Sequence, residues 1–72
     1  MDDLRLKFGE NLREQRKRMG LTQERLAELS KLDRTEISLL ERGQRMPQLD
    51  TIVALTRGLG LRSPGELLGG LF

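Results

Sequence analysis

Apolar residues recur along the chain at helical spacing, and no stretch alternates between apolar and polar residues as a strand does. Glycines and helix-capping residues divide this pattern into five segments. We therefore expect five helices, over residues 3–19, 22–30, 33–42, 49–59 and 64–68. The predicted fold class is all-α, a compact five-helix bundle. The 72 residues are enough for one domain, which we place at 1–72.

Each predicted helix has residues that we expect to face a common core, because they recur about once per turn. In chain order they are Leu4, Phe8, Leu12, Met19, Leu26, Ala27, Leu29, Ser30, Ile37, Leu40, Leu49, Ile52, Val53, Leu55 and Leu59. Thr22 and Asp33 are suited to cap the second and third helices, and Gly20 and Gly43 to end the first and third. Ser63 and Glu66 have the spacing of a capping box, with Pro64 at the first helical position.

The second and third predicted helices are short and lie about three residues apart, which predicts a helix-turn-helix unit over residues 22–42. Ala27 is small where the two helices must approach each other, and Leu32 can be buried under the turn. Ile37 and Leu40 would anchor the third helix from below. Its remaining residues then point outward near its start, where a helix lying in the DNA major groove contacts base edges.

The charged residues fit DNA binding but do not establish it. There are 13 basic and 11 acidic residues, a formal net charge of +2. Ten of the basic residues are arginine, which is suited to bidentate contact with phosphates and base edges. An ordinary solvated surface explains the charge equally well.

Several function classes are disfavoured by what the sequence lacks. It has no cysteine and no histidine, which removes disulfides, the commonest metal ligands and the usual general base. We see no glycine-rich phosphate loop and no carboxylate cluster, so we expect no enzyme, metal or cofactor. No apolar run approaches the ~20 residues of a membrane span. The acidic start Met1-Asp2-Asp3 is unlike a signal peptide, and we expect a cytoplasmic protein of bacterial or phage type.

Residues 21–61, LTQERLAELSKLDRTEISLLERGQRMPQLDTIVALTRGLGL, resemble the Cro/repressor-type (Xre-like) helix-turn-helix family. Among its members, stand-alone controller proteins of restriction-modification systems and small phage repressors look most similar. The resemblance covers about residues 5 to 61. The matching points are Leu21-Thr22-Gln23, Leu26-Ala27, Leu32-Asp33-Arg34-Thr35, Ile37-Ser38, Leu40-Glu41-Arg42-Gly43, Pro47 and the apolar pattern of the fourth helix.

The resemblance implies a lambda-repressor-like bundle with its third helix in the major groove, and roles for individual residues. The residues it implies for base reading are Arg34, Thr35, Glu36 and Ser38. Those for phosphate binding are Gln23, Arg42, Gln44 and Arg45. Arg16 and Glu41 would form a structural ion pair that fixes the third helix to the first. Each DNA-contacting residue also has a plainer interpretation as an exposed polar side chain.

Two positions depart from the family pattern. Lys31 stands where the turn often has glycine, so the turn must be strained or slightly altered. Glu36 stands where related controllers often have an aromatic or neutral polar residue. Its carboxylate can accept a hydrogen bond from a cytosine amino group. The alternative for Glu36 is an ion pair with a nearby arginine.

The end of the chain is rich in apolar residues, which predicts a dimer interface within residues 61–72. The candidates are Leu61, Leu67, Leu68, Leu71 and Phe72. The alternative is that they close the bundle from beneath. A twofold dimer would place two reading helices on half-sites about 34 Å apart.

We thus expect a transcriptional regulator that binds a palindromic operator as a homodimer, with no small-molecule effector site. The rival is a protein-interaction module, antitoxin-like or scaffold, that keeps the fold without reading DNA. The two differ in whether Arg34, Thr35, Ser38 and Arg42 share one exposed face.

Overall fold

The computed structural model describes residues 3–72, and the first two residues of the acidic start discussed above lie outside this range. Its helices are α1 (Asp3–Arg18), α2 (Gln23–Ser30), α3 (Arg34–Glu41), α4 (Leu49–Gly58) and α5 (Gly65–Leu68). None of the described residues forms a strand. The all-α prediction with five helices is confirmed. No predicted helix boundary differs from the observed one by more than one residue.

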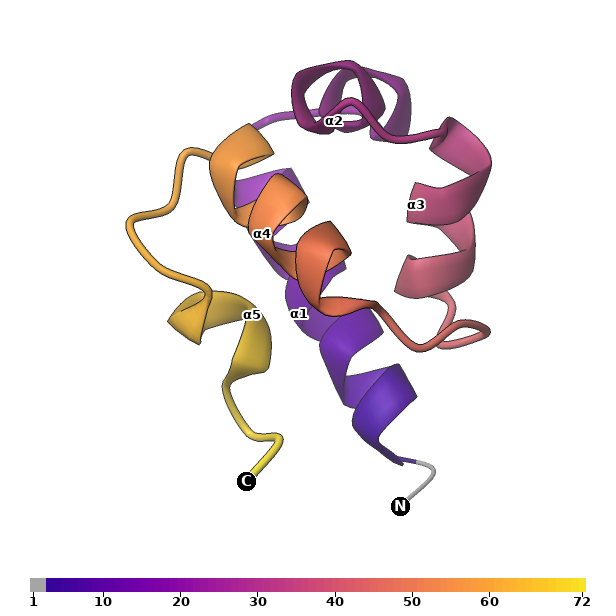
Figure 1. The fold of residues 1–72 in the computed structure, drawn as a ribbon, viewed down its shortest axis with the longest axis vertical. Coiled ribbons are helices and arrows are strands. Elements are labelled where there is room, and N and C mark those ends of the chain that lie inside the picture. Colours follow the sequence, from indigo (N-terminus) through magenta and orange to yellow (C-terminus); the bar gives the residue numbers. More distant parts are fainter. Residues whose placement is uncertain (1–2) are drawn as a thin grey trace.

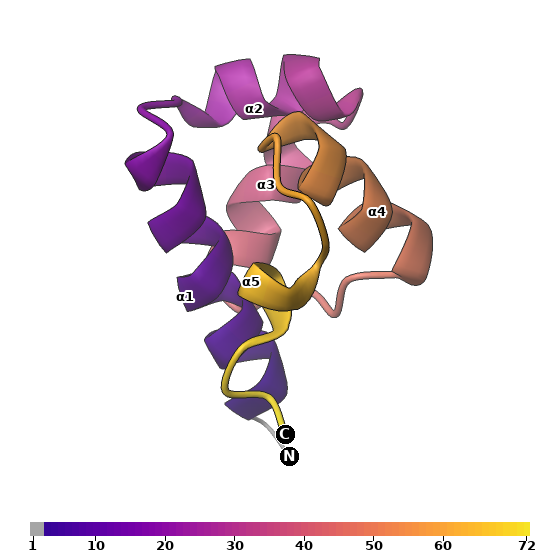
Figure 2. The ribbon, with the colours of Figure 1, turned by 90° about the vertical axis from the view of Figure 1, so that its left-hand side faces the viewer.

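The five helices surround one core rather than forming a parallel bundle. Figures 1 and 2 show α2 lying across one end of the molecule, above α1 and α4. In Figure 1, α3 lies on one side of α4 and α5 on the other. Helix α1 contacts both α3 and α5, and α2 contacts both α3 and α4. The helix-turn-helix unit therefore rests on a scaffold made by α1 and α4.

The core receives side chains from all five helices. Its buried apolar residues are Phe8, Leu12, Leu26, Ala27, Ile37, Leu40, Leu55, Leu59 and Leu67. Leu32 of the α2–α3 turn is half-buried and packs against this cluster, as the sequence pattern predicts.

Local hydrogen bonds set the limits of α2 and α3. The Thr22 side chain accepts a hydrogen bond from the Arg25 backbone N–H at 3.0 Å. The Asp33 side chain accepts one from the Thr35 N–H at 3.3 Å. Between the caps, Lys31 adopts a left-handed conformation with φ of 58°. Lysine thus takes the conformation for which glycine is usual, so the turn is kept at a cost in backbone strain.

Two glycines allow close helix crossings. A Cβ atom on Gly9 of α1 would lie 2.5 Å from the Leu40 carbonyl oxygen of α3. A Cβ atom on Gly58 of α4 would lie 2.2 Å from Ser30 Oγ of α2. Real Cβ atoms do not approach backbone atoms so closely, so the crossing of α1 and α3 requires glycine, whereas the nearest atom at Gly58 belongs to a serine side chain. The crossing at Gly9 holds the end of α3 against α1.

The periodicity was wrong about four core residues, which are exposed in the structure. They are Met19, Leu29, Leu49 and Val53, at 51%, 43%, 78% and 40% relative exposure. Met19 follows the last residue of α1, and Leu29 lies on the outer side of α2. Leu49 and Val53 lie one turn apart on α4 and share its outward face. Periodicity identifies a wide apolar stripe on a helix, but it does not indicate which part of that stripe the neighbouring helices cover.

Some polar side chains are buried instead, where they hydrogen-bond to the backbone. Asn11 Nδ2 donates to the Leu67 and Gly69 carbonyl oxygens at 3.0 and 2.8 Å. These bonds tie α5 to α1. The predicted capping box is not formed, because α5 begins at Gly65 without a side-chain cap. The Ser63 hydroxyl accepts from the Gly65 N–H at 3.3 Å, an arrangement local to the turn.

Candidate nucleic-acid interface

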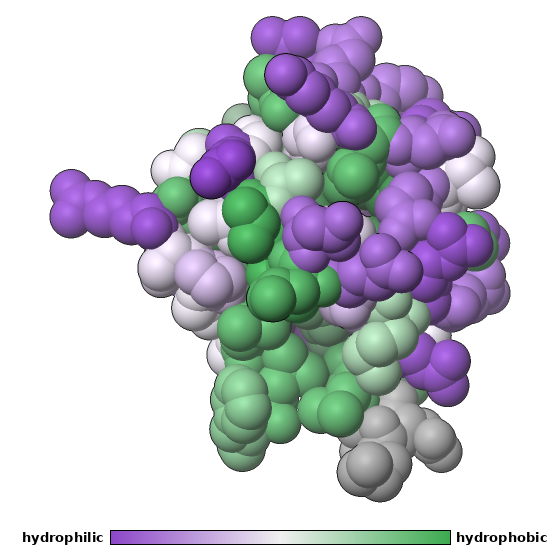
Figure 3. Space-filling view, viewed as in Figure 1, coloured by the Kyte–Doolittle hydropathy of each residue, from purple (hydrophilic) through white to green (hydrophobic). Residues whose placement is uncertain are grey.

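Helix α3 presents its polar start to solvent because its other side is held in the core. Ile37 and Leu40 are completely buried, at 0% exposure. Arg34 and Thr35, at the start of the helix, are exposed, and Ser38 is half-buried. Of the residues expected to read bases, Arg34 and Thr35 are therefore open to solvent, whereas Glu36 and Ser38 are half-buried. Figure 3 shows hydrophilic side chains gathered over α2 and α3.

An ion pair between Arg16 and Glu41 fixes α3 to α1. Arg16 Nε donates to Glu41 Oε2 at 2.6 Å, and Nη2 donates to Oε1 at 3.1 Å. Their side chains are only 12% and 4% exposed. Arg16 Nη1 also donates to the Leu21 carbonyl oxygen at 2.8 Å. The pair that the resemblance implies is thus present, and it extends to the loop before α2.

Gln23, expected to contact a phosphate, joins this network. Its Nε2 donates to Glu41 Oε1 at 3.1 Å, so one carboxylate links α1, α2 and α3. Gln23 is half-buried and is the first residue of α2. The network holds the N-terminus of α2, where backbone N–H groups favour an anion, in a fixed position beside α3.

A polar hollow of about 160 Å³ opens beside this network. Its lining residues are Arg13, Arg16, Gln23, Ser38, Glu41 and Arg42. Three of the proposed DNA-contacting residues therefore meet in one place. With three arginines and one glutamate, the lining carries a net positive charge, which suits a phosphate group.

Sequence reasoning missed Arg13. It lies three residues before Arg16 on α1, so the two share one helix face. Once Arg16 is paired with α3, this spacing alone places Arg13 near α3 as well. The signal was present in the sequence but depends on knowing which way Arg16 points.

Two further arginines near α3 are paired with acidic side chains. Arg34 Nε lies 3.0 Å from Oε2 of Glu24, a residue of α2 that the sequence did not single out. Arg45 Nη1 donates to Glu36 Oε1. Glu36 thus forms the ion pair that was the alternative to cytosine contact. The pair ties the loop after α3 to α3 itself.

Gln44 and Arg42, the remaining phosphate candidates, lie at the end of α3. Both are exposed. Arg42 Nε donates to the Ser38 carbonyl oxygen at 3.4 Å, and the Gln44 backbone N–H donates to the Leu39 carbonyl oxygen at 2.9 Å. The phosphate candidates Gln23, Arg42 and Gln44 therefore gather at the C-terminal end of α3.

The residues expected at a dimer interface are not equivalent. Leu67 is completely buried in the core, so its placement at an interface is wrong. Leu61, Leu68 and Leu71 are half-buried against the core, which matches the alternative that they close the bundle. Phe72 is fully exposed, at 108%. A four-residue helix has too few residues for periodicity to identify its buried side.

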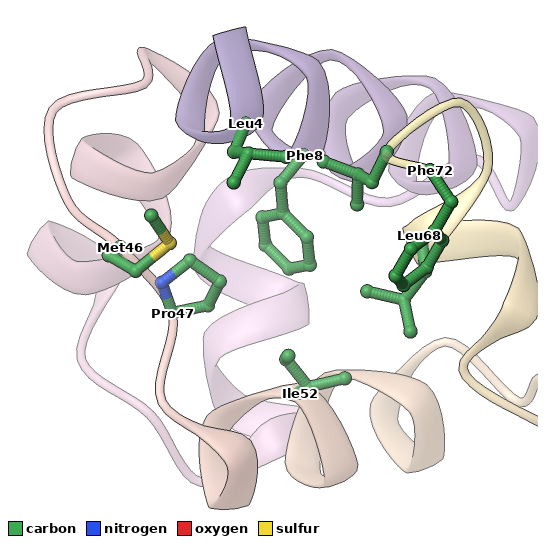
Figure 4. Close-up of a pocket in the computed structure, with 8 residues that line it drawn as sticks. Leu4, Phe8, Met46, Pro47, Ile52, Leu68 and Phe72 are labelled. Carbon is green, nitrogen blue, oxygen red and sulfur yellow. The ribbon is translucent and has the colours of Figure 1, made fainter. Parts of the chain in front are cut away.

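An apolar hollow of about 400 Å³ lies on the same side as the tail. Figure 4 shows its lining from α1, the α3–α4 loop, α4, α5 and the tail, and the residues are Leu4, Phe8, Met46, Pro47, Ile52, Leu68, Leu71 and Phe72. In Figure 3, apolar side chains cover the lower part of the face, away from α2 and α3. Within residues 3–72, no helix is long and apolar enough to cross a membrane.

A three-residue turn, an outward helix start and a basic border define a helix-turn-helix DNA-binding domain. The chain belongs to this family, since the family model described as helix-turn-helix matches residues 12–67. It is a DNA-binding transcriptional regulator, of a family that is not enzymatic.

Its similarity to restriction-modification controllers extends over nearly the whole chain. It is 40% identical over 68 residues to control protein C.BamHI of Bacillus amyloliquefaciens, covering 93% of this chain and 83% of that protein. It is 39% identical over 62 residues to control protein C.SmaI of Serratia marcescens, covering 86% and 74%. The crystal structure of the controller protein C.AhdI of Aeromonas hydrophila superposes with a TM-score of 0.85 at 48% identity, covering 93% and 98%. The predicted family resemblance is confirmed.

Proposed function

We propose that this protein binds a palindromic operator as a homodimer, with α3 in the major groove of each half-site. The observation that supports this most is the orientation of α3. Ile37 and Leu40 are fully buried, and Arg34 and Thr35 on its first turn are exposed. The N-terminal residues of a recognition helix reach base edges from this orientation.

In this proposal, Arg34, Thr35 and Ser38 read the bases. Arg34 binds guanine O6 and N7 as a bidentate donor, and Thr35 contacts a thymine methyl group or a phosphate. Glu36 takes part through Arg45, since the ion pair between them holds the arginine at the border of α3. Because the Glu36 carboxylate is already paired with Arg45, we assign it the role of positioning Arg45 rather than of contacting cytosine directly.

The phosphate contacts come from Gln23, Arg42, Gln44 and Arg45, and we add Arg13. The polar hollow supports the addition, because Arg13 lines it together with Gln23 and Arg42. A DNA phosphate at this position would be close to three donors from three different helices or helix ends. Phosphate contacts supply affinity and register, whereas base contacts supply specificity.

We place the dimer interface on the exposed residues Leu49 and Val53 of α4, together with the apolar hollow that Met46 and Phe72 line. Leu49 is 78% exposed and lies one turn from Val53 on α4. Apolar side chains that are exposed and contiguous mark interaction surfaces in soluble proteins. A second copy of the chain is the occupant we propose, because the lower apolar part of the face in Figure 3 lies away from α2 and α3. Both reading helices then stay available to DNA.

The same face bears on the expectation that there is no effector site. The apolar hollow is large enough for a small molecule, and its lining is almost entirely apolar. It is continuous with exposed Phe72 and Met46, as Figure 4 shows. We therefore assign it to the dimer and propose that protein concentration controls operator occupancy.

The test is selection of preferred sites from random duplex DNA. We expect a twofold-symmetric sequence whose half-sites are about one helical turn apart. Arg34→Ala should weaken binding mainly to that sequence. Arg45→Ala should weaken binding to all sequences and lower the salt slope by about one. Selection that returns no preferred sequence would favour the interaction module instead, and equal losses for Arg34→Ala on preferred and random DNA would contradict base reading.

A further inference from the structure

The ion pair between Glu24 and Arg34 joins the first turns of α2 and α3. Arg34 Nε lies 3.0 Å from Glu24 Oε2, and the side chains of Arg34 and Glu24 are 58% and 65% exposed. Ion pairs this exposed add little to the stability of a fold. The start of a helix also disfavours an arginine, because the helix dipole is positive there. The placement of this pair therefore calls for an explanation other than stability.

We propose that Glu24 is a positioning residue that orients the Arg34 guanidinium for guanine recognition. The inference rests on the proposed function, in which Arg34 reads a base. A carboxylate on Nε occupies one edge of the guanidinium. The edge formed by the two Nη groups stays available, and it is the edge that can bridge guanine O6 and N7.

Orientation matters because the arginine side chain is long and rotates freely. Ordering such a side chain during binding has an entropic cost that weakens the complex. Glu24 restricts the Arg34 side chain in the free protein, so this side chain loses less conformational entropy when it binds DNA. Glu24 also lowers the affinity for DNA of any sequence, because its negative charge repels the phosphates. It therefore raises specificity rather than total affinity.

The chain supplies a matched control for this effect. Glu28 lies four residues after Glu24 on α2 and pairs with Arg25 at 2.9 Å, with side chains 68% and 58% exposed. Glu24→Gln and Glu28→Gln thus remove the same charge from the same helix, and each removes one exposed ion pair. They differ in which arginine is released.

The experiment measures the ratio of affinities for the selected site and a random duplex at fixed salt. Glu24→Gln should lower this ratio by up to about fivefold per protomer, the upper limit for an exposed ion pair. Glu28→Gln should leave it unchanged. In an Arg34→Gln background, Glu24→Gln should have no larger effect than Glu28→Gln. The inference is overturned if Glu24→Gln behaves like Glu28→Gln in the unmodified chain. It is also overturned if Glu24→Gln raises the ratio, since Glu24 would then compete with guanine for Arg34.

A second measurement needs no DNA. Nitrogen-15 relaxation of the Arg34 Nε–H group should show restricted motion in the unmodified protein and in Glu28→Gln, and freer motion in Glu24→Gln. Equal motion in all three proteins would overturn the inference even if DNA is read by Arg34. A different result is possible: relaxation shows that Glu24 restricts Arg34, but the unmodified protein prefers no duplex sequence. In that case the proposed function is wrong, although the ion pair exists in solution. The two failures are therefore distinguishable.

Discussion

Glu41→Ala should be among the most damaging single substitutions in this protein. It removes the carboxylate that accepts hydrogen bonds from Arg16 and Gln23, and the Arg16 side chain is only 12% exposed. The guanidinium would keep one bond, to the Leu21 carbonyl oxygen at 2.8 Å. Removing one partner of a buried ion pair leaves a charge away from water without compensation, which costs about 3–5 kcal/mol.

The effect is large compared with the stability expected of the whole domain. A chain of 72 residues has a free energy of unfolding of roughly 4–11 kcal/mol, at about 0.05–0.15 kcal/mol per residue. A loss of about 3 kcal/mol corresponds to a fall of roughly 12–24 °C in Tm for a domain of this size. We therefore expect Glu41→Ala to be partly unfolded at 37 °C.

Urea unfolding followed by circular dichroism measures this change, and Glu28→Ala is its control. The Arg25–Glu28 pair is exposed at both side chains, so its loss should cost less than about 1 kcal/mol. Replacing both partners, with Arg16→Met and Glu41→Leu together, should recover part of the stability because no buried charge is left. Equal losses for Glu41→Ala and Glu28→Ala would refute the argument that burial makes the first pair important.

Three further predictions concern the scaffold and the proposed interface. Gly9→Ala should destabilise the fold by about 1–3 kcal/mol in urea unfolding, since its Cβ would lie 2.5 Å from the Leu40 carbonyl oxygen; an unchanged midpoint would contradict the close crossing. Lys31→Gly should stabilise by about 0.5–1 kcal/mol, because relief of the left-handed strain exceeds the entropy that glycine adds to the unfolded chain; lower stability would contradict this. Leu49→Ser should shift sedimentation towards the monomer with little loss of monomer stability, whereas Leu67→Ala should cost about 2–5 kcal/mol in stability; the reverse pattern would exclude the proposed interface.

The helices were predictable because their signals are local. Thr22 and Asp33 cap α2 and α3 through bonds to residues two or three positions away. Gly20 and Gly43 have positive φ where the sequence expects helix ends. Such signals depend on the chain within one turn, so sequence alone contains them. The buried positions Ile37 and Leu40, and with them the outward start of α3, follow from the same periodicity.

The contacts between helices were not predictable in the same way. Asn11 is polar within an apolar helix face, and only the position of the α5 carbonyl groups explains its burial. Leu49 and Val53 fit an inward stripe, yet the helices within residues 3–72 leave both of them exposed. Gln23 shares the carboxylate of Glu41 because three helices meet there. Each case depends on how elements distant in sequence are placed, which no local pattern specifies.

In the proposed function, the exposed start of α3 reads bases in the major groove. Methylation interference on the selected operator tests it directly, because methylation of guanine N7 blocks the major-groove edge. We expect methylated guanines to prevent binding at two clusters about one helical turn apart, and Arg34→Ala to abolish the sensitivity at one guanine in each. Interference only from minor-groove methylation of adenine N3, or from none of the bases, would contradict the account.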